Sequence, residues 1–218
     1  LMDQVLQDSG NNSSSKKKKK QQKNKLHKKS KETNLLQNGN LRFVTFPEVR
    51  RNAIKNNWLK IYTPIVEQLK VQIRLNLKLH RIELKAHSET ESPAALQKAD
   101  DYVQAFVYGF ALQDAIALVR LDDIYMESFK INDVKPLHDQ HLGRAIGRIV
   151  GRNGATKFAL ENTTKTRIVI NNNNLHILGT YQNVINARNG LCDLILGSPA
   201  QKVYSKLRSI SSRQREMN

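Results

Sequence analysis

The chain has 218 residues, enough for one large domain or two small ones, and its 36 Lys and Arg against 19 Asp and Glu give a net charge of +17. This balance favours a polyanionic partner, either nucleic acid or an anionic membrane surface. Cys192 is the single cysteine, which excludes an intrachain disulfide and a cysteine-based zinc site, and no apolar run has the length of a membrane span, so we expect no membrane partner.

The charge lies mainly at the two ends of the chain. Residues 1–40 carry 10 Lys against 3 acids (+7), residues 41–138 carry 14 basic against 12 acidic residues (+2), and residues 139–218 carry 12 against 4 (+8). Residues 1–40 hold too few apolar side chains to form a core and predict a disordered tail. Their lysine run resembles a nuclear or nucleolar targeting stretch, and a solvated tail with nonspecific phosphate contacts explains it equally well.

The globular pattern begins at Leu41, where residues 41–46 predict a strand. Apolar residues then recur at helical spacing up to Leu69. Because a proline ring disfavours helix geometry at the residue before it, Pro64 predicts two short helices that meet in a bend, with Thr63 as the N-cap of the second.

Two alternating segments, residues 71–78 and 81–87, predict the strands of a hairpin with a two-residue turn. Pro93 then begins a predicted helix that continues to about Leu121. The second half of the chain repeats this order of strand, helix, helix, strand, strand and helix in residues 127–134, 139–150, 155–160, 166–170, 175–179 and 180–197.

The repeat predicts an α+β fold of two tandem units, each a three-stranded sheet with helices packed on one face. A basic C-terminal helix follows in residues 199–218, and its apolar seam is expected to dock on the second unit before its charged face contacts RNA. We therefore divide the chain into the tail 1–40, a first domain 41–125, a second domain 126–198 and the extension 199–218.

The sequence Gly-Arg-Asn-Gly at residues 151–154 lies between the two helices of the second unit. Glycines let a backbone approach closely, and the amides that open the following helix favour an anion. Asn153 tolerates a positive φ at the loop tip. We predict that this loop and its basic neighbours bind RNA, through Arg144, Arg148, Gly151, Arg152, Asn153, Gly154, Thr156, Lys157, Lys165 and Arg167.

A plain helix turn with surface arginines would explain the glycines alone, but the loop lies between two helices, before two strands, in a region of net charge +8. A nucleotide-binding phosphate loop does not fit, because no G-x-x-x-x-G-K-[ST] occurs. His138 and His141 lack accompanying carboxylates, so we predict no metal and no cofactor. Nothing resembles a nucleophile with its base, so we predict no enzyme.

Helix, GxxG, helix, strand, strand and helix is the pattern of the K-homology (KH) domain, which implies a cleft for about four nucleotides of single-stranded nucleic acid. Longer segments, "NWLKIYTPIVEQLKVQIRLNLK", "HLGRAIGRIVGRNGATKFALENTTKTRIVI" and "LILGSPAQKVYSKLRSISSR", resemble the Partner-of-NOB family of small-subunit assembly factors. That family's loop usually has a glycine where Asn153 stands and a basic residue where Ala155 stands.

The resemblance implies a first KH unit without GxxG, whose bend would be "IYTP" at residues 61–64 and which would pack, brace and bind protein. It implies binding to pre-rRNA near the 3′ end of the small-subunit rRNA, beside a PIN-domain endonuclease, other assembly factors and ribosomal proteins. It also implies a place in the nucleolus and nucleus, and in the cytoplasm with the maturing subunit. The alternatives are a protein-interaction scaffold and a general single-stranded-RNA-binding KH protein.

Overall fold

The computed structural model describes residues 40–88, 90 and 93–216, so the predicted tail up to residue 39, with its lysine run, lies outside the described residues. Two three-stranded antiparallel sheets are present, with strand orders β1-β3-β2 and β4-β6-β5. In both sheets the last strand of the unit lies in the middle, and the strand that follows the helix pair lies at an edge. The repeat predicted from the sequence is therefore a repeat of topology.

The elements of the first unit are β1 (Leu41–Thr45), η1 (Glu48–Arg50), α2 (Arg51–Asn56), α3 (Trp58–Leu69), β2 (Val71–Asn76), β3 (Arg81–Ala86), α4 (Pro93–Tyr108), α5 (Leu112–Ala115) and α6 (Ala117–Arg120). Those of the second unit are β4 (Ile124–Lys130), α7 (Ile131–Val134), α8 (Asp139–Val150), η2 (Arg152–Gly154), α9 (Ala155–Thr164), β5 (Arg167–Asn171), β6 (Asn174–Thr180) and α10 (Tyr181–Leu196), followed by α11 (Ala200–Glu216). The second sheet thus begins two residues before the predicted boundary.

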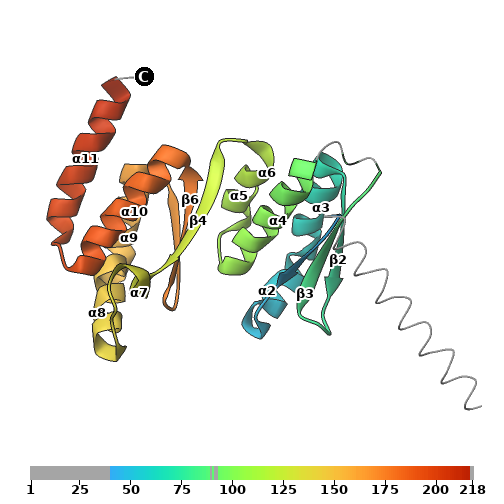
Figure 1. The fold of residues 1–218 in the computed structure, drawn as a ribbon, viewed down its shortest axis with the longest axis horizontal. Coiled ribbons are helices and arrows are strands. Elements are labelled where there is room, and N and C mark those ends of the chain that lie inside the picture. Colours follow the sequence, from blue (N-terminus) through green and yellow to red (C-terminus); the bar gives the residue numbers. More distant parts are fainter. Residues whose placement is uncertain (1–39, 89, 91–92, 217–218) are drawn as a thin grey trace, which may run out of the picture.

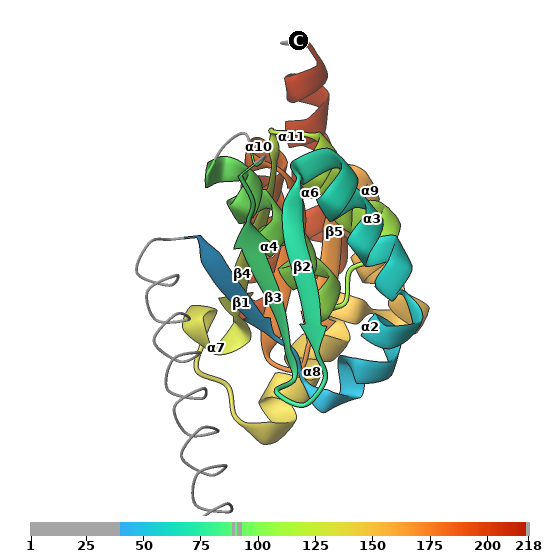
Figure 2. The ribbon, with the colours of Figure 1, turned by 90° about the vertical axis from the view of Figure 1, so that its right-hand side faces the viewer.

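The layers alternate along the long axis of the molecule (Figure 1): the first sheet, its helices, the second sheet, its helices and then α11. One face of the second sheet packs on α8 to α10 through Ile168, Leu175 and Ile177. The other face joins the first unit's core through Val169 and Leu178. Helices therefore cover both faces of the second sheet, while the outer face of the first sheet remains open toward the viewer in Figure 2.

The predicted bend at Thr63 is wrong, because α3 runs unbroken from Trp58 to Leu69 with Pro64 inside it. Proline removes the amide that would bond to the carbonyl of Lys60. The hydroxyl of Tyr102 in α4 approaches that carbonyl at 3.5 Å, so tertiary packing supplies a partner that the local pattern does not reveal. The helix junction lies instead at Asn57, whose φ is −103° and whose side chain donates to the carbonyl of Ala53 at 2.9 Å.

Three other predicted boundaries move for local reasons. The hairpin turn has four residues rather than two, and His80 adopts a φ of 49° within it. The long helix predicted up to Leu121 ends at Tyr108, because Gly109 takes a φ of 118°. The strand predicted at 127–134 ends at Lys130, whose amide donates to the Asp133 carboxylate at 3.1 Å and opens α7.

The C-terminal helix docks on the second unit as predicted. Val203 and Leu207 are buried in the second core, among residues of α9 and α10. The approach is close at Gly190, where an added Cβ would lie 3.0 Å from Cδ1 of Leu207. α11 therefore packs on the outside of α9 and α10 (Figure 1), and its exposed face carries the basic side chains Lys202, Lys206, Arg208 and Arg213.

The two units meet at a buried histidine on β6. The ring of His176 stacks on that of Tyr108 with centroids 4.1 Å apart and an interplanar angle of 7°. Its Nδ1 lies 2.6 Å from the Ser128 hydroxyl, and its Nε2 is buried without a hydrogen-bond partner among the described residues. Desolvation by this burial lowers the pKa of His176.

The lowered pKa predicts a pH-dependent junction. Above the ordinary histidine pKa of about 6.5 the ring is neutral in both the folded and the unfolded chain, so this histidine makes no pH-dependent contribution to the free energy of unfolding. Below that value the unfolded chain binds a proton that the folded chain does not, so the free energy of unfolding falls as pH decreases, by at most about 1.4 kcal/mol per pH unit for one proton. Urea unfolding of the native chain and of His176→Gln from pH 7.5 down to 5.5 measures this slope. The variant should be less stable at pH 7.5 but should lose less stability on acidification, and equal slopes would contradict the assignment.

Candidate nucleic-acid interface

Helix α8 leads into the loop with one apolar face and one open face. Ala145 and Ile149 are buried in the second core. Gly143 and Gly147 lie on the exposed side, and a Cβ added at either would meet nothing within 4 Å. Because these positions carry no side chain and face open space, another backbone can approach the helix closely there.

Three of the four residues in the loop at 151–154 have a positive φ. Gly151 has φ 73° and ψ −178°, Asn153 has φ 54° and ψ 29°, and Gly154 has φ 79° and ψ 5°. Asn153 therefore adopts the positive φ predicted for it. At Gly151 an added Cβ would also lie 2.1 Å from Oγ1 and 2.8 Å from the backbone nitrogen of Thr156, so this position excludes any side chain.

The loop ends at the N-terminus of α9, which begins at Ala155 and has no side-chain cap. The first amides of a helix lack partners within it, and the helix dipole places positive potential there. Arg152 and Asn153 are exposed beside these amides. A phosphate group at this point would meet backbone donors and a guanidinium together.

Three of the predicted basic residues are exposed and have no ion pair in the part of the chain that the structure describes: Arg144, Arg152 and Lys165. Arg152 lies beyond the end of α8, in the loop itself. Lys165 ends α9 with a φ of 55°. The three residues belong to α8, to the loop and to the far end of the helix that follows it.

The other three predicted basic residues are engaged within the molecule. Arg148 donates to the carbonyls of Leu194 and Ile195 at 3.1 and 3.2 Å, where α10 ends and its last carbonyls lack helical partners. Lys157 lies 3.8 Å from the Glu161 carboxylate. Arg167 donates to Asp114 of the first unit at 3.1 Å. Their predicted contacts with RNA stay predictions, and Arg148 and Arg167 also hold the fold together.

Comparison with known proteins identifies the family. A profile of the eukaryotic type KH domain (KH-domain type I) matches residues 128–212, and a profile of the Krr1 KH1 domain matches residues 42–121. RNA-binding protein pno1 from Ixodes scapularis is 52% identical over 184 residues, which cover 84% of this chain and 79% of the relative. The chain belongs to the Pno1 family. Pre-rRNA-processing protein PNO1 from Coccidioides immitis is 51% identical over 175 residues, covering 80% and 69%.

Solved structures share the two-unit fold of this Pno1-family chain. Dim2p from Pyrococcus horikoshii OT3 superposes with a TM-score of 0.69 at 25% identity, covering 78% of this chain and 98% of Dim2p. A chain of the a/eIF2alpha-aDim2p-rRNA complex from the same organism gives 0.69 at 26% identity, covering 79% and 94%. A protein of unknown function from Aeropyrum pernix gives 0.73 at 22% identity, covering 81% and 93%, and shares the fold.

Two residues of α9 in this candidate interface are not predicted from the sequence. Glu161 is buried, and its Oε1 accepts the amide proton of Ile168 at 2.7 Å, which fastens α9 to the edge strand β5. Phe158 is 64% exposed one turn after the loop. The sequence offers a signal only for Phe158, an aromatic residue directly after Lys157 near a glycine loop. A buried glutamate that bonds to backbone has no local signature.

Neither a metal site nor a membrane span is found in the described ranges. No group of three or more His, Cys, Asp and Glu side chains there could hold a metal ion. His138 and His141 are both exposed at the start of α8. No helix among the described residues is long and apolar enough to cross a membrane.

The two loop glycines are expected to differ in their tolerance of alanine. Gly154→Ala imposes a left-handed backbone on a residue with a Cβ, which costs about 1–3 kcal/mol. Gly151→Ala carries the same cost and adds the contacts with Thr156, so its loss of unfolding free energy should be clearly larger. Denaturant unfolding of the two variants measures the difference. Equal losses would mean that the loop relaxes around the new Cβ.

Proposed function

We propose that this Pno1-family chain is an RNA-binding assembly factor of the small ribosomal subunit, which binds pre-rRNA near the 3′ end of the small-subunit rRNA. The observation that carries the proposal is the loop at 151–154, where three residues with positive φ lead into the start of α9, which has no side-chain cap, beside an arginine without an ion pair among the described residues. The names of the relatives, RNA-binding and pre-rRNA-processing proteins, support it. So does the archaeal complex in which aDim2p is found with rRNA and a/eIF2alpha.

In this proposal the second unit holds one RNA strand by its backbone. A phosphate binds at the first amides of α9 with Arg152, and the strand continues past Gly147 and Gly143 toward Arg144. Single strands leave their bases free, and Phe158 offers an exposed ring on which one base can stack. Phosphate contacts fix the position of the strand, while bases in the cleft supply the choice of sequence.

The first unit serves protein contacts and bracing. Its helix junction at Asn57 has no glycine pair and no positive φ, so it does not form a phosphate-binding loop. The partners of this unit would be a PIN-domain endonuclease, which makes the final cut, together with other assembly factors and ribosomal proteins. The chain would assist this cut without catalysing it, in the nucleolus and nucleus and later with the maturing subunit in the cytoplasm.

Charge reversal at the loop tip tests the RNA contact. In the double variant Arg152→Asp with Asn153→Asp, aspartate at position 153 still accepts a left-handed backbone. The two new carboxylates replace the guanidinium that would contact a phosphate. Losing a hydrogen bond to a charged group costs about 1.5–3 kcal/mol, so affinity for an RNA oligonucleotide of the small-subunit rRNA 3′ end should fall at least about tenfold. Fluorescence anisotropy measures the affinity, and thermal unfolding should be nearly unchanged.

The matched control is Lys55→Asp with Asn56→Asp. It makes the same change of charge at the helix junction of the first unit, where both side chains are exposed. Its RNA affinity should stay within about twofold of the native chain, because salt screens the interaction between exposed charges that lie more than a Debye length of about 10 Å apart. Undiminished affinity of the loop variant would contradict the proposed clamp and favour a protein scaffold.

The salt dependence of binding counts the phosphates in contact. For a single strand the logarithm of affinity should fall with the logarithm of salt concentration by about 0.7 per neutralised phosphate. The loop variant should show a shallower slope than the native chain. In cells, crosslinking should recover the 3′ end of the small-subunit precursor, and recovery of unrelated mRNAs would contradict the ribosomal assignment.

A further inference from the structure

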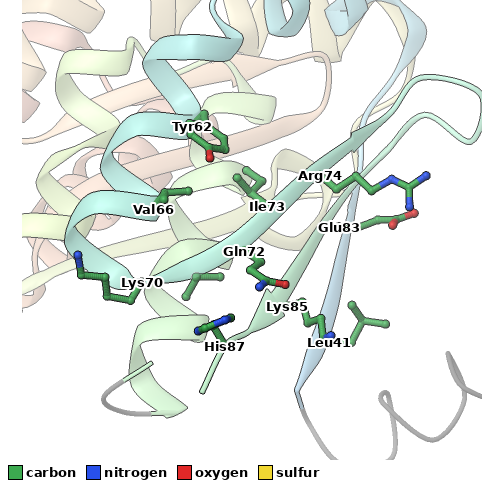
Figure 3. A pocket seen from close by; sticks show the side chains of 11 residues that line it. Leu41, Tyr62, Val66, Lys70, Gln72, Ile73, Arg74, Glu83, Lys85 and His87 are labelled. Carbon is green, nitrogen blue, oxygen red and sulfur yellow. The ribbon is translucent and has the colours of Figure 1, made fainter. Parts of the chain in front are cut away.

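The first unit contains a cavity beside the helix that precedes its edge strand. It has a volume of about 630 Å³ and lies where α3 meets the edge strand β2 (Figure 3). Tyr62 and Val66 of α3 lie beside Ile73 of β2 in this view. The corresponding elements of the second unit are α9 and its edge strand β5.

The two units can be aligned here by an unusual backbone position. Lys70 ends α3 with a φ of 53° and Lys165 ends α9 with a φ of 55°. Counting back along each helix, Tyr62 corresponds to Lys157 and Val66 corresponds to Glu161. The ion pair between Lys157 and Glu161 of α9 is therefore replaced by an aromatic and an aliphatic side chain in α3.

β2 is an edge strand among the described residues, so half of its backbone groups have no partner strand there. The amide of Ala86 donates to the carbonyl of Asn40 at 2.9 Å, and at the other end of β3 the amide of Phe46 donates to His80 at 2.9 Å. Hydrogen-bonded pairs alternate along an antiparallel ladder, so the even-numbered residues of β3 bond to β1 and the odd-numbered ones to β2. The β2 residues that direct their N–H and C=O away from the sheet are therefore Val71, Ile73 and Leu75.

The rim of the cavity is basic. Lys70, Arg74 and Lys85 line it, and none of the three has an ion pair within the described ranges. The single acidic residue of the rim, Glu83, accepts hydrogen bonds from Arg81 at 2.9 Å and from Asn76 at 3.2 Å, so its charge is already compensated. Carboxylates at the ends of an occupant would find cations there without displacing an existing pair.

We propose that this cavity, which is an open groove between α3 and β2, binds an extended, acidic peptide segment of a partner protein, which adds to β2 as a further strand. The open backbone of Ile73 supplies the main-chain bonds, Tyr62 and Val66 contact alternate apolar side chains of the peptide, and Lys70 and Lys85 bind carboxylates. RNA is disfavoured as the occupant, because the junction at Asn57 offers no phosphate-binding loop. The groove is independent of RNA binding by the second unit.

The test selects peptides of about 14 residues, long enough for a strand with flanks, from a random phage-displayed library on the full chain. Enriched sequences should alternate apolar residues and carry Asp or Glu. Synthetic peptides are then titrated by fluorescence anisotropy against Lys70→Glu with Lys85→Glu, which should weaken binding at least tenfold. Lys55→Glu with Lys60→Glu makes the same charge change at exposed positions outside the groove and should bind as the native chain does.

Strand addition has its own signature. Two peptides are methylated at the amide nitrogens of every second residue, one at the odd and one at the even positions. One of them should lose binding and the other should keep it nearly intact, because only alternate amides face β2. Failure to enrich any peptide, equal binding by both lysine variants, or the same effect of methylation in both methylated peptides would overturn the proposal. So would a uridine-rich RNA whose binding is lost in Lys70→Glu with Lys85→Glu and kept in the loop variant, which would make the groove an RNA site. The loop variant itself should bind the peptides normally, whatever its RNA affinity.

Discussion

The arrangement of the two units depends on how the second sheet is covered on the face opposite its own helices. Val169 and Leu178 of the second sheet pack in the hydrophobic core of the first unit and not in that of their own unit. The fit is close at Gly109, where an added Cβ would lie 3.3 Å from Cγ1 of Val169. The stack of His176 on Tyr108 and the ion pair between Arg167 and Asp114 surround this contact. Because apolar burial and a satisfied ion pair occur together, the two units form one continuous structure.

One consequence is that equivalent surfaces acquire different chemistry. In both units a helix ends at a lysine with a left-handed backbone conformation, and the edge strand follows directly. Only the second has a loop whose geometry requires glycine, and only its surroundings carry a large excess of positive charge: +8 in residues 139–218 against +2 in residues 41–138. In the first unit the helix junction lies at Asn57, and the cavity between α3 and β2 has apolar side chains and a basic rim. The same topology thus carries a glycine loop in a basic region in one unit and an apolar cavity with a basic rim in the other.

The order of elements, the amphipathic helix before the loop and the positive φ of Asn153 follow from the sequence because each is set by local chemistry. The predictions that fail depend on distant partners. Pro64 stays inside a helix because Tyr102 approaches the carbonyl that it leaves free. Arg148 lies four residues from both Arg144 and Arg152 in the sequence, yet its guanidinium bonds to carbonyls at the end of α10. Spacing identifies which residues share a face of one helix, and it carries no information on what a second helix brings to that face.

Glu161 limits where an RNA backbone can lie in the proposed function. Its carboxylate is held by the amide of Ile168 at 2.7 Å and is therefore a fixed negative charge between α9 and β5. Lys157, at 3.8 Å, compensates that charge only in part, since this distance exceeds a direct hydrogen bond. A phosphate near Glu161 would be repelled, whereas one near the loop meets Arg152 and the helix amides. The backbone of a bound strand must then follow the glycine side of the cleft, which leaves its bases directed toward α9 and β5.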